Sequence, residues 1–133
     1  MLILDNRPMY LGIEKETRIL DLQKEFSNSY PYLKLEFFKN PVSQNKILQK
    51  AEKINPIESI KRLTRLYEPR SISIDPKRTV AQLVNDFFEI FGLSVLVFRK
   101  SGNLWIETSL TDSWTLDKQN KIGESFSSST ESL

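Results

Sequence analysis

Residues 80–99 read VAQLVNDFFEIFGLSVLVFR, and residues 19–39 read ILDLQKEFSNSYPYLKLEFFK. Four apolar or aromatic positions of the earlier stretch recur 61 residues later: Ile19, Leu22, Phe26 and Tyr30 return as Val80, Leu83, Phe87 and Phe91. Beyond them the shift falls to 60, because Pro31 and Tyr32 stand where the later stretch has only Gly92. Spacings of three, four and four residues keep one apolar stripe along a helix, and the following run is typical of a strand. The sequence therefore predicts an internal repeat.

Each repeat is predicted to run strand, helix, strand. Alternating apolar residues mark the first strand of each: Leu11 and Ile13, then Ile72 and Ile74. Thr17 and Thr79 are expected to cap the helices, because a hydroxyl can accept from an orphan backbone N–H. Pro31 and Gly92 are expected to end the helices.

Two such units in tandem predict an α+β fold with a ferredoxin-like antiparallel sheet and both helices on one face. The alternative is two looser βαβ lobes that pair through a continuous sheet. We expect one domain over residues 1–123, with repeat one at about 10–39, a helical insertion at about 43–67 and repeat two at about 71–99. A C-terminal strand and short helix follow at about 103–122, and the Ser-rich residues 124–133 are predicted to be a disordered tail.

Local signals refine the segments outside the two repeats. Ser43 is expected to cap one short helix of the insertion, and Asn55 to cap a second with Pro56 in its first turn. A hairpin turn at residues 100–103 is expected to lead into a fifth strand over about 104–110. The last helix is predicted to begin at Thr115 and to end near Gly123.

The chain contains no cysteine and no histidine. This composition removes disulfides, thiol nucleophiles, imidazole bases and the usual zinc and copper ligands. We therefore expect no metal and no cofactor, and the balance leans against an enzyme. No apolar run approaches the roughly 20 residues that span a bilayer, so no membrane partner is expected. The apolar start at residues 1–4 is too short for a signal peptide, which makes the cytoplasm the expected location.

The face of the predicted sheet that turns away from the helices carries large apolar side chains: Phe38, Leu96, Phe98 and Trp105. Such a face should not stay in water. The inserted helices could cover it, a second copy could cover it in an isologous dimer, or it could stack nucleic-acid bases. Cover by the chain or by a partner protein is preferred, because the alternating basic, glycine and aromatic signature of RNA-recognition strands is missing.

Both tryptophans lie within residues 103–116. One interpretation is a small site, with Trp105 and Trp114 as its walls and with Glu107 and Asp112 as acid and base. The simpler interpretation is a strand, an Asp-Ser turn and a helix cap, which require the same residue types for backbone reasons. We prefer the simpler interpretation.

The middle of the chain is basic. Residues 39–78 hold ten Lys or Arg against four Asp or Glu, whereas residues 101–133 hold two basic and five acidic residues. Arg62, Arg65 and Arg70 could contact phosphates, which is the nucleic-acid alternative. A solvated helix face requires the same charges, and the net charge of +2 is small.

Residues 91–108, reading FGLSVLVFRKSGNLWIET, and residues 111–120, reading TDSWTLDKQN, resemble a family of small bacterial proteins that share FGLxVxVFRKSGNxWxETT and TDxWTLxxQN. The likeness covers roughly Thr79 to Asn120, with a looser fit of the first repeat. Ser109 stands where the family has a second Thr, which weakens a ligand role for that pair. The resemblance implies a common fold and a bacterial cytoplasmic setting. It transfers no activity and no catalytic residue.

Together these features predict a non-enzymatic binding or self-association domain, expected to be a homodimer. A nucleic-acid-binding accessory domain that uses the basic segment 61–78 and the sheet aromatics is the main alternative. A small carboxylate-dependent enzyme around Glu107 and Asp112 is the third.

Overall fold

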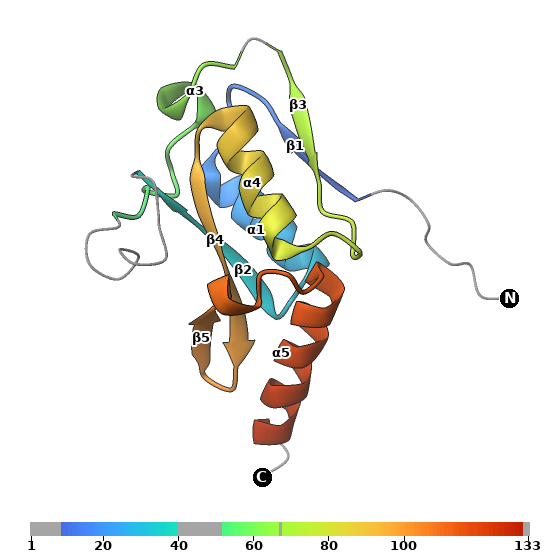
Figure 1. Ribbon diagram of the computed structural model, residues 1–133. Helices are drawn as coiled ribbons and strands as arrows, with labels where there is room; N and C mark the ends of the chain where they lie inside the picture. Colours follow the sequence, from blue (N-terminus) through green and yellow to red (C-terminus); the bar gives the residue numbers. More distant parts are fainter. Residues whose placement is uncertain (1–8, 40–51, 67, 132–133) are drawn as a thin grey trace, which may run out of the picture.

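The computed structural model describes residues 9–39, 52–66 and 68–131. In chain order its elements are β1 (Tyr10–Ile13), α1 (Ile19–Ser29), β2 (Leu33–Phe38), α3 (Ile60–Leu63), β3 (Arg70–Ser73), α4 (Val80–Phe91), β4 (Ser94–Ser101), β5 (Leu104–Glu107), the 3-10 helix η1 (Ser109–Thr111) and α5 (Leu116–Glu131) (Figure 1). The strands form two antiparallel sheets, β1-β3 and β2-β4-β5. The predicted mixture of helices and antiparallel strands is confirmed.

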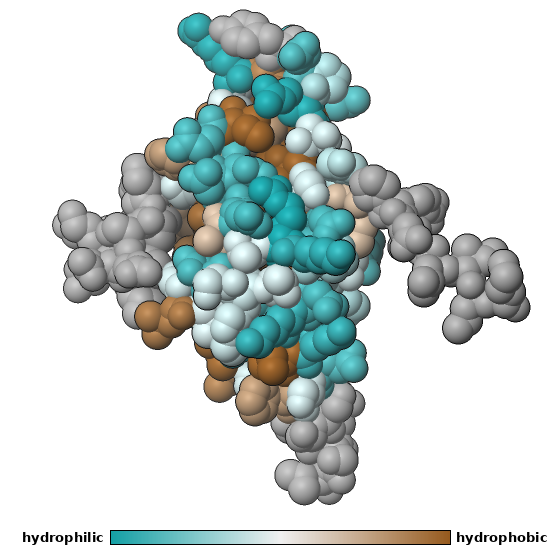
Figure 2. Space-filling model, turned by 45° about the vertical axis from the view of Figure 1, so that its right-hand side comes forward, coloured by the Kyte–Doolittle hydropathy of each residue, from teal (hydrophilic) through white to brown (hydrophobic). Residues whose placement is uncertain are grey.

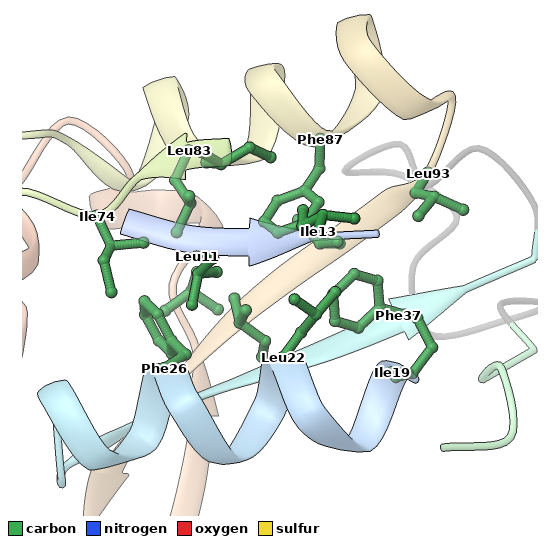
Figure 3. Packing of buried hydrophobic residues seen from close by; sticks show 14 of the residues in the cluster. Leu11, Ile13, Ile19, Leu22, Phe26, Phe37, Ile74, Leu83, Phe87 and Leu93 are labelled. Atoms are coloured by element: carbon green, nitrogen blue, oxygen red, sulfur yellow. The ribbon is translucent and has the colours of Figure 1, made fainter. Parts of the chain in front are cut away.

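The core lies where α1 and α4 meet the two sheets. In Figure 3, side chains of α1 and α4 point toward each other, with β1 lying between the two helices. Phe87 of α4 meets Phe37 of β2 edge-on, with ring centroids 5.3 Å apart. The stripe predicted on each helix is buried: Ile19, Leu22, Phe26 and Tyr30 on one, and Val80, Leu83, Phe87 and Phe91 on the other. Hydrophobic burial of these stripes holds the helices in place.

The arrangement of strands differs from the single ferredoxin-like sheet that the sequence predicts. Among the described strands, β1 pairs with β3 and β2 pairs with β4, so the four strands are divided between two sheets. The rule for right-handed crossovers applies to parallel strands of one sheet, and here the strands on either side of each helix belong to different sheets. An alternating pattern tells which face of a strand is buried but not which strand is its neighbour, and this is why the expected sheet differs from the observed ones.

Corresponding strands of the two halves lie opposite each other. Leu11 is opposite Ile72 in the β1-β3 ladder, and Glu36 is opposite Leu96 in the β2-β4 ladder. These pairs are separated by the shifts of 61 and 60 residues that relate the two stretches of sequence. The two halves therefore meet through antiparallel pairing of their corresponding strands.

The segment before α3 and the segment before α5 are held by equivalent sets of backbone hydrogen bonds. In the first half, the backbone N–H groups of Ile19, Leu20, Ile60 and Lys61 donate to the backbone carbonyls of Glu58, Pro56, Thr17 and Lys15, respectively. In the second half, the backbone N–H groups of Val80, Ala81, Leu116 and Asp117 donate to the backbone carbonyls of Trp114, Asp112, Arg78 and Pro76, respectively. Thus α3 is attached to the start of α1 as α5 is attached to the start of α4.

The predicted caps are partly correct. Thr79 accepts a hydrogen bond from the backbone N–H of Gln82, and Gly92 ends α4 with a φ of 68°. In α1, however, the N-cap is Arg18, whose backbone N–H donates to the Asp21 carboxylate, and Thr17 instead accepts from the N–H of Glu14. The helix expected at Asn55 begins only at Ile60, because Asn55 forms a turn in which its side-chain oxygen accepts from the N–H of Ile57.

Two further segments differ from the expectation. The strand expected to reach residue 110 ends at Glu107, and η1 follows it. The last helix does not end near Gly123 but continues to Glu131, through most of the region predicted to be a disordered tail. Thr115 does mark its start, since its hydroxyl accepts from the N–H of Lys118. The helix predicted at Ser43 lies largely outside the described residues, and residues 52–54 run along the edge of β2, where Lys53 forms a bridge with Phe38.

Candidate binding surface

The outer face of the β2-β4-β5 sheet, which turns away from α1 and α4, is the apolar surface for which the sequence predicts a cover. There Phe38 is only 6% exposed and Leu96 only 7%, although neither belongs to the main core cluster. At these two residues the face is covered within this chain, which is one of the three alternatives that the sequence leaves open. Phe98 is half-buried, and Trp105 keeps 39% of its surface exposed.

A lysine covers the aromatic part of this outer face. The Lys34 ammonium lies 4.8 Å from the ring centroid of Trp105 and 5.6 Å from that of Phe98. Its charge also meets Glu36 at 3.6 Å, and Glu36 meets Lys53 at 3.8 Å. A cation held over two aromatic faces is attracted by their quadrupoles, so Lys34 shields the rings from water while its head stays partly solvated. The aromatic residues are among those that the sequence predicts for this face, and Lys34 is not.

The exposed apolar side chains gather at β5 instead. Of the eight large hydrophobic residues that are exposed in the described part of the chain, four form what we call the β5 surface: Leu104, Trp105, Ile106 and Leu110. Leu104 is 69% exposed and Leu110 is 95% exposed. Figure 2 shows hydrophobic atoms at the surface near the lower end of the molecule, the end at which Figure 1 places β5 and α5.

The β5 strand is also an edge of its sheet. Its residues pair with β4 on one side, and within the described residues no strand pairs with the other side. An edge strand presents backbone N–H and C=O groups that can pair with another chain, and apolar side chains strengthen that tendency. Charged residues, which protect such edges, are represented in β5 only by Glu107.

The second tryptophan lies on the other side of the sheet. Trp114 contacts two cations, the Lys118 ammonium at 4.2 Å and the Arg99 guanidinium at 5.7 Å from its ring centroid. Arg99 is opposite Ile106 in the β4-β5 ladder, so its side chain leaves the sheet on the face opposite to that of Trp105. The structure therefore does not bring the two indoles together as walls of one site.

Arg99 and α5 are joined by a buried polar network. An Arg99 N–H donates to the side-chain oxygen of Gln119 at 2.8 Å, and the Gln119 amide donates to the carbonyl and hydroxyl oxygens of Thr111 at 2.8 and 2.9 Å. Gln119 is fully buried. Because these bonds satisfy both the donor and the acceptor of a buried amide, the network fixes α5 against β4 and η1.

The Glu107 carboxylate and the Asp112 backbone take part in local structure. Glu107 accepts hydrogen bonds through Oε1 from the backbone N–H of Ser109, at 2.8 Å, and from its hydroxyl. Asp112 accepts through its backbone carbonyl from the N–H of Ala81, which ties η1 to α4. These contacts agree with the simpler interpretation of the segment, and the carboxylate enzyme stays a prediction.

The three arginines of the nucleic-acid alternative differ in their ion pairing. Arg62 lies 3.7 Å from the carboxylate of Glu58, which precedes α3. Arg65 and Arg70 are exposed, and neither has an ion-pair partner in the described part of the chain. The nucleic-acid alternative stays a prediction.

A hollow of about 530 Å³ lies at the other edge of the sheet, beside the start of α3. Its lining is Glu36, Lys39, Lys53, Ile54, Asn55, Pro56, Glu58 and Leu63. Several of these charges are already paired, Lys53 with Glu36 and Lys39 with Glu52. Of these residues, only Asn55 and Pro56 carry a signal in the sequence, that of a helix start, and that signal does not indicate a hollow.

Within the described ranges, no helix has the length and apolar character needed to cross a membrane, and no cluster of three or more Asp or Glu could hold a metal ion. Neither a protein-family model, nor a curated protein, nor a solved structure matches this chain.

Proposed function

We propose that this chain is a non-enzymatic binding domain that associates with a second copy of itself through the β5 surface. The observation that carries the proposal is the concentration of exposed apolar side chains, led by Leu104 and Leu110, on and beside an edge strand. Exposed apolar side chains along a free edge strand are typical of an interaction site. A C2 dimer buries the same surface on both copies, so one such edge is sufficient.

The contrast between the two edges of the sheet supports β5 as the binding edge. At the β2 edge, the segment that pairs with Phe38 exposes the charged residues Glu52 and Lys53. Charges of this kind discourage pairing with another chain. At the β5 edge, the corresponding positions are occupied by Ile106 and Glu107, and the strand begins with Leu104 and Trp105.

The test is the solution mass by light scattering behind a sizing column, measured over a series of dilutions. We expect twice the 15.5 kDa mass of one chain at the highest concentration. Ile106→Lys should give the mass of a single chain, because two copies cannot bury that charge without a partner. Phe88→Lys is the matched control, since Phe88 is exposed on α4, outside the β5 surface. A wild-type chain that is monomeric at every concentration, or a Phe88→Lys variant as monomeric as Ile106→Lys, would contradict the proposal.

We also infer that residues 52–66 belong to the first repeat and are not an insertion. The matched hydrogen bonds before α3 and α5 support this, as does a further pair: the N–H of Ile54 donates to Phe37, and the N–H of Thr108 donates to Val97. Ser59 forms a bridge with Arg18 as Thr115 does with Thr79. Each repeat would then consist of a strand, a helix, a strand, a return strand and a final helix.

A further inference from the structure

We propose that the two copies join by pairing β5 with β5 in antiparallel fashion, with the two-fold axis passing between the Ile106 residues. The inference rests on the proposed function and specifies its partner and its geometry. It would extend the three-stranded sheet continuously from one copy into the other, in the order β2-β4-β5-β5-β4-β2.

The hydrogen bonds of β5 tell which of its backbone groups face the open edge. The N–H of Thr108 donates to the carbonyl of Val97 while Glu107 lies opposite Phe98. This places Glu107 in a pair that exchanges no hydrogen bonds, so its own N–H and C=O point away from β4. Because the pattern alternates, the backbone groups of Trp105 also point outward and those of Ile106 point toward β4.

The outward groups favour one register. With Ile106 on the axis, Trp105 of each copy lies opposite Glu107 of the other. Each of these two pairs can exchange two backbone hydrogen bonds, about four in all. With Trp105 on the axis, Glu107 would instead face Asn103, which lies in the turn and outside the strand. The first register uses every outward group of both strands.

The side chains fit the same register. Ile106 of one copy would pack against Ile106 of the other, with Leu104 beside them on the same face. On the opposite face, Glu107 of one copy would approach Trp105 of the other, over which the Lys34 ammonium lies at 4.8 Å. A carboxylate brought next to an ammonium over an aromatic ring is electrostatically complementary.

The absence of cysteine from the chain allows a direct test by disulfide cross-linking. Directly opposite residues in a pair without hydrogen bonds have Cα atoms about 4.5 Å apart, within the roughly 4.4–6.8 Å that a disulfide spans. The full-length variant Ile106→Cys should therefore form a covalent dimer under mild oxidation, seen on a non-reducing gel. In the variant Trp105→Cys, the two cysteines would be diagonal neighbours about 7–8 Å apart and should cross-link poorly. Phe88→Cys controls for cross-linking by random collision.

The outcomes separate this inference from the proposed function. A covalent dimer of Ile106→Cys at much higher yield than those of Trp105→Cys and Phe88→Cys supports the pairing. A wild-type dimer by light scattering with no preference for Ile106→Cys overturns the strand pairing and leaves self-association standing. Efficient cross-linking of Trp105→Cys instead overturns the register. A monomeric wild-type chain overturns both proposals.

Discussion

Gly123 of α5 lies so close to Tyr32 that a Cβ on the glycine would stand 2.8 Å from the Cβ of Tyr32. The same atom would stand 3.2 Å from both Cγ of Arg99 and the carbonyl oxygen of Lys100. The missing side chain therefore sets the distance at which α5 packs on β4. This glycine thus serves the packing of α5 and does not end the helix, whereas the sequence alone predicts an end there.

The first prediction concerns this contact. Gly123→Ala should lower the free energy of unfolding by about 1–2 kcal/mol, because overpacking outweighs the roughly 1 kcal/mol by which alanine favours a helix. Urea unfolding followed by circular dichroism measures the change. Gly12→Ala is the control, since nothing lies within 4 Å of a Cβ at that position. A Gly123→Ala variant as stable as the wild type would show that α5 is not held at this distance.

The second prediction compares two neighbouring phenylalanines of α4. Phe87 is fully buried against Phe37, whereas Phe88 is about half exposed. Phe87→Ala should cost about 3–5 kcal/mol of stability through lost burial and the cavity that remains. Phe88→Ala should cost less than about 1 kcal/mol. Equal costs for the two variants in thermal unfolding would contradict the orientation of α4.

The third prediction concerns pH. The Tyr30 hydroxyl donates to the carbonyl of Ile74 at 2.5 Å. Burial, and then the negative charges of Asp75 and Asp117, raise the pKa of Tyr30 above its ordinary value of 10.0. Above pH 10 the Tyr30 hydroxyl loses its proton in the unfolded chain and keeps it in the folded chain. The stability that Tyr30 contributes is therefore present below pH 10 and falls as the pH rises.

Tyr30→Phe removes both the hydrogen bond and the titration. At pH 7 we expect the variant to be less stable by about 1 kcal/mol. Between about pH 10 and pH 11, its stability should decline less steeply than that of the wild type. Denaturant unfolding at each pH gives both curves. Parallel curves would show that Tyr30 titrates alike in the folded and unfolded chains.

The fourth prediction concerns the buried network of Gln119. Gln119→Leu should lower stability by about 1–3 kcal/mol, because the half-buried groups of Arg99 and Thr111 lose their hydrogen-bond partner. Lys121→Gln serves as the control on the same helix, since Lys121 is exposed and its ion pair with Asp117 is of the surface i,i+4 kind. If Gln119→Leu proves as stable as Lys121→Gln, the network contributes nothing beyond packing.

Local features were predictable from the sequence where a residue type has one strong use. Thr79 with Gln82, and Gly92 at a positive φ, mark the two ends of α4 because capping and left-handed backbone depend on these residues directly. The buried stripes of α1 and α4 follow from helical periodicity alone. At Asn55 and Thr17 a turn competes for the same side-chain oxygen, and the sequence does not tell which use prevails.

Long-range features were not predictable in the same way. No pattern within β1 tells that its neighbour is β3, since that choice depends on how both halves close over one core. The Lys34 ammonium over Trp105 joins residues that are far apart in the chain and carry no motif. The exposed apolar cluster at β5 could be predicted only in part, through Trp105, because alternation alone does not tell that Leu104 and Leu110 stay exposed.

The pairing of Leu11 with Ile72 and of Glu36 with Leu96 has a consequence for synthesis. When the first half leaves the ribosome, both of its long-range strand partners are still to be made, so its apolar stripe has no sheet to close over it. Contacts this distant in sequence raise the contact order and slow folding, because loop entropy is lost before the contacts form. We therefore expect chaperones to bind the nascent first half, and we expect the domain to fold only after β4 has left the ribosome.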